Sequence, residues 1–197
     1  LIVPLGEQML RASLAAARAW ADARPGLPAL SVAVNLAVRQ LQKPGIVADV
    51  AAILAETGAD PAGIKLEITE SGVMGNAAQT QEIMRGLQKL GVSLAIDDFG
   101  TGYSSLSHLT RFPFDFLKVD MSFVRAMHEN PESMAVVRTI VGLAHSLGKK
   151  LIAEGVETHR QLATLRELGC HLGQGYLFAK PLPRHEAEEL LAKDPRW

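Results

Sequence analysis

The stretch IKLEITE, residues 64–70, alternates apolar and polar side chains and is typical of a β-strand. Its three aliphatic residues share one face, whereas Lys65, Glu67 and Thr69 share the other. The aliphatic face suits a strand that is covered by helices. A carboxylate within an otherwise apolar strand, such as that of Glu67, must be paired with a cation or bound to a metal ion. The stretch therefore predicts a strand of a helix-covered sheet that carries a functional carboxylate.

Five further apolar runs carry a polar residue near their C-terminal ends. They are SVAVNLA with Asn35, SLAIDDF with Asp97 and Asp98, FLKVD with Lys118 and Asp120, KLIAEGV with Glu154, and LGQGYLF with Gln174. The parallel strands of a barrel deliver their C-terminal ends to one shared face. Several acids on one rim repel one another unless a cation holds them. The sequence therefore predicts a metal site at this rim.

Helical patterns separate the strand-like runs. Three helices are predicted to end in Leu-Gly, at 90–91, 147–148 and 168–169, where glycine supplies a left-handed C-terminal cap. Thr158 and Gln161 have capping-box spacing at the start of the last of these helices. Alternating strands and helices predict a parallel sheet. Because all six strands contribute a polar end, a barrel is favoured over an open doubly wound sheet.

The number of strands falls short of a closed barrel. A (β/α)8 TIM-type barrel has eight strands, whereas the sequence provides six and opens on a helix. A final helix is expected over 184–192, and no linker or charge block divides the chain. We therefore expect one α/β domain over residues 1–197, corresponding to the C-terminal three quarters of such a barrel.

The bulk composition is that of an ordinary globular domain. The 197 residues are 48% hydrophobic, with a mean hydropathy of +0.12. A formal net charge of −1 gives no electrostatic basis for binding long nucleic acid or a membrane surface. The single cysteine, Cys170, rules out an internal disulfide, and no apolar run reaches the roughly 18 residues of a membrane span. We expect a cytoplasmic segment without membrane contact of its own, within a parent protein that could be membrane-anchored.

Six motifs follow one another along the chain, namely SVAVNLA, LEITES, AIDDFGTGYSSL, LKVD, AEGVE and GCHLGQGYLFAKPLP. In their order and spacing they resemble the EAL-domain family of cyclic-di-GMP phosphodiesterases, from the first residue to about Pro183. The resemblance implies an eight-stranded barrel with one reversed strand. It also implies hydrolysis of cyclic-di-GMP to linear pGpG, with two Mg²⁺ or Mn²⁺ ions as cofactors.

The resemblance implies a set of metal ligands. Asn35 and Glu67 match ligands of one ion, and Asp97 matches the carboxylate that bridges both ions. Asp98 and Glu154 match ligands of the second ion. Hard divalent cations prefer oxygen ligands, and these five side chains fit that preference.

The remaining assignments concern the reaction and its surroundings. Lys118 matches the lysine that positions the attacking water, so Lys118, Glu154 and Asp97 are the expected catalytic residues. Asp120 and Gln174 match polar residues of the same site. Glu70 resembles the acid that steadies the loop 98–105, through which the family joins the site to a dimer interface. We therefore expect a homodimer.

One departure from the family leaves alternatives open. The Glu-Ala-Leu tripeptide and the arginine that follows it are absent, so the chain is expected either to be truncated relative to a longer parent or to be a degraded relative. The chain by itself is expected to be inactive, with a sensory or GGDEF domain upstream in the parent. A catalytically inactive cyclic-di-GMP-binding or regulatory module is the second possibility. A barrel aldolase using Lys118 is the third, although nearby carboxylates should raise the pKa of that lysine rather than lower it.

Overall fold

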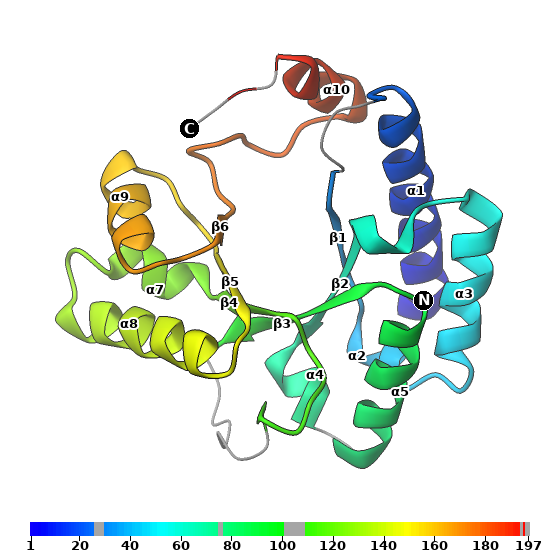
Figure 1. Cartoon of the computed structure of the whole chain (residues 1–197), viewed down its shortest axis with the longest axis horizontal. Helices are drawn as coiled ribbons and strands as arrows, with labels where there is room; N and C mark the ends of the chain where they lie inside the picture. The colour runs from blue at the N-terminus through cyan, green and yellow to red at the C-terminus, as the bar shows by residue number, and fades with distance from the viewer. Residues whose placement is uncertain (26–29, 75–76, 101–108, 194, 196–197) are drawn as a thin grey trace. The chain divides into compact units, whose positions relative to one another are not determined.

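The computed structural model describes residues 1–25, 30–74, 77–100, 109–193 and 195 (Figure 1). Six strands lie among these residues, and their order in the sheet is their order in the chain. The chain divides into two compact units, Leu1–Leu117 and Lys118–Trp197. The single domain over 1–197 remains a prediction.

The first unit is built on three parallel strands, β1 (Val32–Asn35), β2 (Ile64–Thr69) and β3 (Ser93–Phe99). Asn35 is paired in register with Glu67, and Thr69 is paired with Asp97. The strand predicted from IKLEITE is thus confirmed. Because side chains alternate along a strand, Asn35, Glu67 and Asp97 lie on one face of the sheet.

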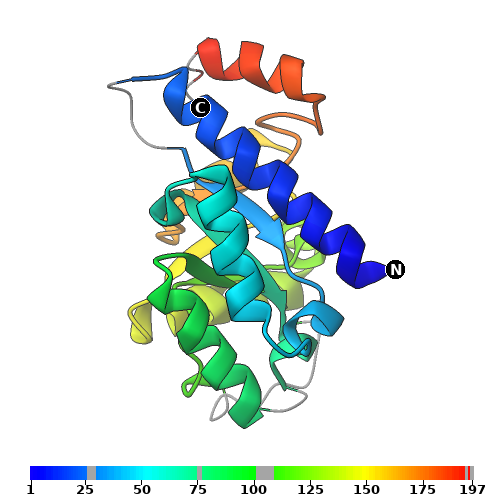
Figure 2. The ribbon, with the colours of Figure 1, turned by 90° about the vertical axis from the view of Figure 1, so that its right-hand side faces the viewer.

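Helices cover the strands of the first unit. The helical segments are α1 (Ile2–Asp22), α2 (Val38–Leu41), α3 (Ile46–Thr57), η1 (Pro61–Gly63), α4 (Glu70–Met74) and α5 (Ala77–Lys89). α1 packs on α3, and α3 packs on α5, so that the three helices lie side by side (Figures 1 and 2). Their buried residues include Leu14, Ile53 and Met84, and the aliphatic residues of β2 are also buried. Helices over an aliphatic strand face are the arrangement that the sequence predicted.

Asp115 fixes the chain that leads into β4 (Phe116–Val119). Its backbone N–H donates to the carbonyl of Leu94 at 2.9 Å, and its carboxylate accepts the N–H of Leu94 at 2.9 Å. The side chain of Gln88 also donates to this carboxylate, at 3.3 Å. A single acidic residue therefore joins α5, the start of β3 and the approach to β4.

The second unit contains β5 (Lys150–Ala153), β6 (Leu172–Gly173) and several helices. These helices are α7 (Met121–Ala126), α8 (Pro131–Ser146), α9 (His159–Glu167) and α10 (Arg184–Ala192). β5 and β6 are parallel. α8 packs on α7 and on β5, and its buried stripe includes Val137, Val141 and Ala144.

Several local predictions are confirmed, and one is wrong. Gly91, Gly148 and Gly169 have positive φ angles, and Thr158 and Gln161 form a capping box. The run LGQGYLF, however, contributes only Leu172 and Gly173 to the sheet. The residues that follow turn toward the backbone of Val156, where the N–H of Leu177 donates to the Val156 carbonyl at 3.0 Å.

A close approach of two backbones explains this short strand. A Cβ atom on Gly175 would lie 2.2 Å from the carbonyl oxygen of Val156, a separation that no side chain tolerates. Glycine therefore permits the chain to leave the sheet and fold against Val156. The apolar residues of LGQGYLF accompany this close packing against Val156. The hydrophobic pattern of the sequence alone does not distinguish such a packed turn from a strand.

Candidate metal centre

Asn35 is the last residue of β1 and lies opposite Glu67, two residues before the end of β2. Glu67 is 6% exposed, although it carries a carboxylate, whereas Asn35 is exposed. Both residues, together with Thr69, line a cavity of about 560 Å³ in the first unit. A buried carboxylate beside an amide oxygen at the edge of a cavity offers two oxygen donors to a cation. The structure thus brings these two predicted residues together.

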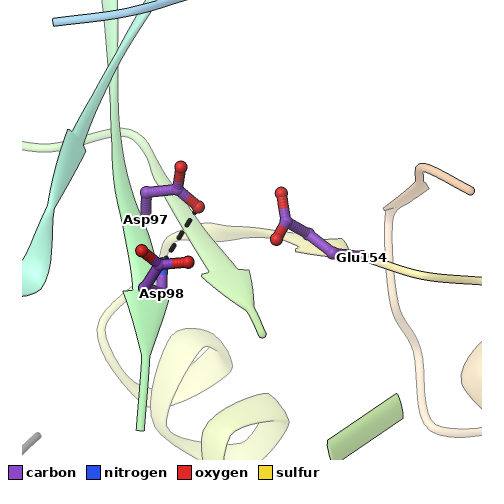
Figure 3. A group of neighbouring side chains, drawn as sticks. All are labelled: Asp97, Asp98 and Glu154. Carbon is purple, nitrogen blue, oxygen red and sulfur yellow. Dashed lines mark hydrogen bonds between the residues drawn. The ribbon is translucent and has the colours of Figure 1, made fainter. Parts of the chain in front are cut away.

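Asp97 and Asp98 lie near the end of the adjacent strand, β3. The Oδ1 atom of Asp97 accepts the backbone N–H of Asp98 at 2.9 Å, and Figure 3 shows this bond as a dashed line. A carboxylate oxygen of one residue lies within 4.8 Å of one of the other. Asp97 is 8% exposed. Two acids held this close repel each other unless a cation balances them.

The backbone of Asp98 is strained. Its φ angle is 56°, the only positive value at a non-glycine among the residues that the structure describes. Aspartate tolerates the left-handed region better than most residues, but the conformation still has a cost. Such outliers cluster at functional sites. The only signal for this strain in the sequence is the glycine at position 100, which also has a positive φ.

Lys118 and Glu154 form an ion pair within the second unit. The Nζ atom of Lys118 lies 2.5 Å from the Oε1 atom of Glu154, and the lysine is fully buried. Glu154 directly follows β5, and its backbone N–H donates to the carbonyl of Val119 on β4 at 3.1 Å. Figure 3 also shows the Glu154 side chain. The predicted catalytic lysine is therefore fixed by the carboxylate of a predicted metal ligand.

Two of the remaining predicted residues, Glu70 and Asp120, form local hydrogen bonds through their side chains. Glu70 is buried and accepts the backbone N–H of Gly100 at 3.0 Å, whereas residues 101–105 of the loop lie outside the described residues. Asp120 caps α7, because its carboxylate accepts the N–H of Ser122 at 2.9 Å. Gln174 is exposed and lies directly after β6. Their roles in a reaction stay predictions.

Sequence reasoning did not propose Lys65 as a site residue. Its side chain is 6% exposed, and its ammonium lies 4.0 Å from the ring centroid of Phe116. A cation over an aromatic face is stabilised electrostatically, more strongly when it is removed from water. Lys65 precedes Glu67 by two residues and shares its strand face, so the alternation of IKLEITE contained the signal. This face therefore combines a buried cation with the buried acids.

The chain belongs to the EAL domain family, whose model matches residues 1–181. It is 46% identical over 162 residues to the cyclic di-GMP phosphodiesterase NbdA of Pseudomonas aeruginosa. The aligned residues make up 82% of this chain and 21% of NbdA. Across the curated relatives compared, the chain spans 21–39% of their length.

Solved structures have the same fold. The PaMucR phosphodiesterase in its c-di-GMP complex has a TM-score of 0.90 and 38% identity, over 95% of this chain and 75% of that one. Klebsiella pneumoniae BlrP1, in a manganese/cy-diGMP complex, has a TM-score of 0.80 and 32% identity, over 92% and 45% of the two chains. The predicted fold class, an EAL-type barrel with six of its strands present, is confirmed. Among the described residues, no helix is both long enough and apolar enough to cross a membrane.

Proposed function

We propose that this domain hydrolyses cyclic-di-GMP to linear pGpG with two Mg²⁺ or Mn²⁺ ions, as part of a longer protein. The observation that carries the proposal is the register of β1, β2 and β3. It aligns Asn35, Glu67 and Asp97 on one sheet face in a family that includes phosphodiesterases. A row of oxygen donors at strand ends is the arrangement that a hard divalent cation requires.

The residues present fit such ions. Asn35 and Glu67 would bind one ion, and Asp97 would bridge it to the second. Asp98 and Glu154 would complete the ligands of the second ion, as the family resemblance implies. Every one of these side chains offers oxygen and none offers sulfur, which favours Mg²⁺ or Mn²⁺ over softer metals. Two bound ions would lower the pKa of a water and neutralise the attacking and leaving oxygens of the phosphodiester.

The chain's own groups would orient the reaction. Lys118 is held by Glu154, so its ammonium has a fixed direction from which it would donate a hydrogen bond to the attacking water. Glu70 would hold the start of the loop after β3 through the Gly100 N–H. We assign Asp120 and Gln174 to the polar surroundings of the substrate. The chain is an enzyme domain in this proposal, with cyclic-di-GMP as substrate.

The whole protein would add further parts. We propose that it is a cytoplasmic homodimer with an upstream sensory or GGDEF domain. The further domain is supported by the relative MucR, a bifunctional diguanylate cyclase/cyclic di-GMP phosphodiesterase of which the chain spans 27%. An inactive cyclic-di-GMP-binding or regulatory module is the second candidate. The enzyme is favoured because all five proposed metal ligands are present as oxygen donors.

The test is chromatography of the full-length protein incubated with cyclic-di-GMP. We expect pGpG with Mg²⁺ or Mn²⁺, and inhibition by Ca²⁺, whose longer bonds and looser geometry would misplace the nucleophile. Calorimetry with cyclic-di-GMP separates the alternatives. Binding without pGpG would support the inactive module, and the absence of both would reject both candidates.

A further inference from the structure

A buried glutamine, Gln161, joins the loop after β5 to helix α7. It is 6% exposed and lies in the first turn of α9. Its Oε1 atom accepts the backbone N–H groups of Glu157 at 2.8 Å and Thr158 at 2.9 Å. Its Nε2 atom donates to the carbonyl of Val124 at 3.3 Å. A buried carboxamide must satisfy its polar atoms, and this one does so by connecting two separate chain segments.

Helix capping accounts for only part of this arrangement. In the capping box, Gln161 accepts the Thr158 N–H and Thr158 accepts the Gln161 N–H, at 3.2 Å. A glutamate would serve equally well in this box. Only glutamine also provides a donor for the carbonyl of Val124. The bond to α7 is therefore additional to the cap.

The segment after β5 also contacts β4 and α7 at three other points. The Glu154 N–H donates to the carbonyl of Val119 on β4 at 3.1 Å. Gly155, whose φ is 67°, approaches α7 so closely that a Cβ atom would lie 2.7 Å from the Cβ of Met121. Arg125 on α7 pairs with Glu157 at 2.6 Å, but both side chains are substantially exposed, so this pair contributes little. Gln161 therefore supplies the buried side-chain link.

We propose that Gln161 is a positioning residue that holds Glu154 against Lys118. Glu154 leads directly into the segment that Gln161 fixes, and Lys118 lies on the strand that leads into α7. The consequence for catalysis rests on the proposed function, whereas the mechanical link does not. Displacement of a reacting or orienting group by about 1 Å can lower a rate by about 100-fold. Loss of the bond between Gln161 and Val124 should displace the Glu154–Lys118 pair by less than about 1 Å, because the other contacts of this segment remain.

The kinetic test compares two variants of the full-length protein. Gln161→Glu keeps the acceptor of the capping box and removes the donor to Val124, so we expect kcat to fall about tenfold with KM within about twofold. Thr158→Ala removes the other half of the box and keeps the donor to α7, so we expect both constants to stay within about twofold. Equal losses in the two variants, or no loss in Gln161→Glu, would overturn the proposal.

A second measurement is independent of activity and of any Gln161 variant. In the metal-free full-length protein, Glu154→Gln should speed hydrogen exchange of the Glu157 and Thr158 amides at least about fivefold, because coupling between two positions is reciprocal. The Leu165 amide, deeper in α9, reports the loss of global stability that the same substitution causes. Unchanged exchange at the first two amides would overturn the link. A phosphodiesterase assay that failed while this exchange response appeared would reject the proposed function alone.

Discussion

The ammonium of Lys118 and the carboxylate of Glu154 form an ion pair that is nearly withdrawn from water. Only 2% of the Lys118 side chain and 16% of the Glu154 side chain are exposed. Removing one partner from such a pair leaves a buried charge that has lost its compensation. Loss of either partner should therefore destabilise the second unit, separately from the candidate role of the pair in catalysis.

Glu154→Gln should lower the free energy of unfolding by about 1–3 kcal/mol in the metal-free protein, the usual cost of losing a partner of a buried polar group. Glu157→Gln is the matched control, because its pair with Arg125 has side chains that are 45% and 37% exposed. That change should cost less than about 1 kcal/mol. Urea unfolding measures both values, and equal losses would contradict the structural role of the buried pair.

Substitutions of Asp98 should separate stability from activity. Asp98→Asn and Asp98→Gly should unfold close to the original midpoint, because both residues accept a positive φ. Asp98→Val should be less stable by about 1–2 kcal/mol, because its branched side chain clashes in this conformation. All three should lose phosphodiesterase activity if Asp98 is a metal ligand. A valine variant as stable as the glycine variant would contradict the observed backbone.

Asp97→Asn should lower turnover at least about 100-fold, more than the loss of a residue that merely supports a metal ligand. The variant keeps an oxygen for the Asp98 N–H, so the local hydrogen bond survives while the charge is lost. Asp60→Asn is the control, since Asp60 caps η1 in the same unit and asparagine caps equally well. Turnover by chromatography and Mn²⁺ binding by calorimetry should fall only in Asp97→Asn. Near-normal turnover would remove Asp97 from the proposed ligands.

Cys170 should make stability depend on alkaline pH. Burial raises the pKa of its thiol above the ordinary value of 9.0. The folded state therefore holds this proton more tightly than the unfolded state, so the free energy of unfolding falls as the pH rises above 9.0 toward the folded pKa. Below pH 9.0 the thiol is protonated in both states, so it adds no pH dependence to the free energy of unfolding. Urea unfolding across this pH range should show a smaller decrease for Cys170→Ala, and identical profiles would contradict the shift.

Short-range patterns predicted the elements that local chemistry determines. The alternation around Glu67 identified β2, and the Thr158–Gln161 spacing identified the start of α9. Polar residues at strand ends identified Asn35 and Asp97 as site candidates because parallel strands align their C-terminal ends. These inferences needed only the period of a strand or a helix and the direction of the chain.

Contacts between distant segments could not be predicted in this way. The turn at Gly175 depends on the backbone of Val156, and the donor bond of Gln161 depends on the carbonyl of Val124. The positive φ of Asp98 likewise depends on packing around the end of β3. None of these three features follows a local period or spacing. The sequence therefore contains no signal for them unless the contacting segments are already known.

The register of β2 also limits how the length of this domain can vary among its relatives. One residue inserted between Lys65 and Glu67 would turn the carboxylate to the opposite face of the strand, among aliphatic side chains. An insertion within α10, where no residue is buried, would alter no strand pairing. Natural insertions and deletions should therefore accumulate around α10 and be absent from the six residues of β2.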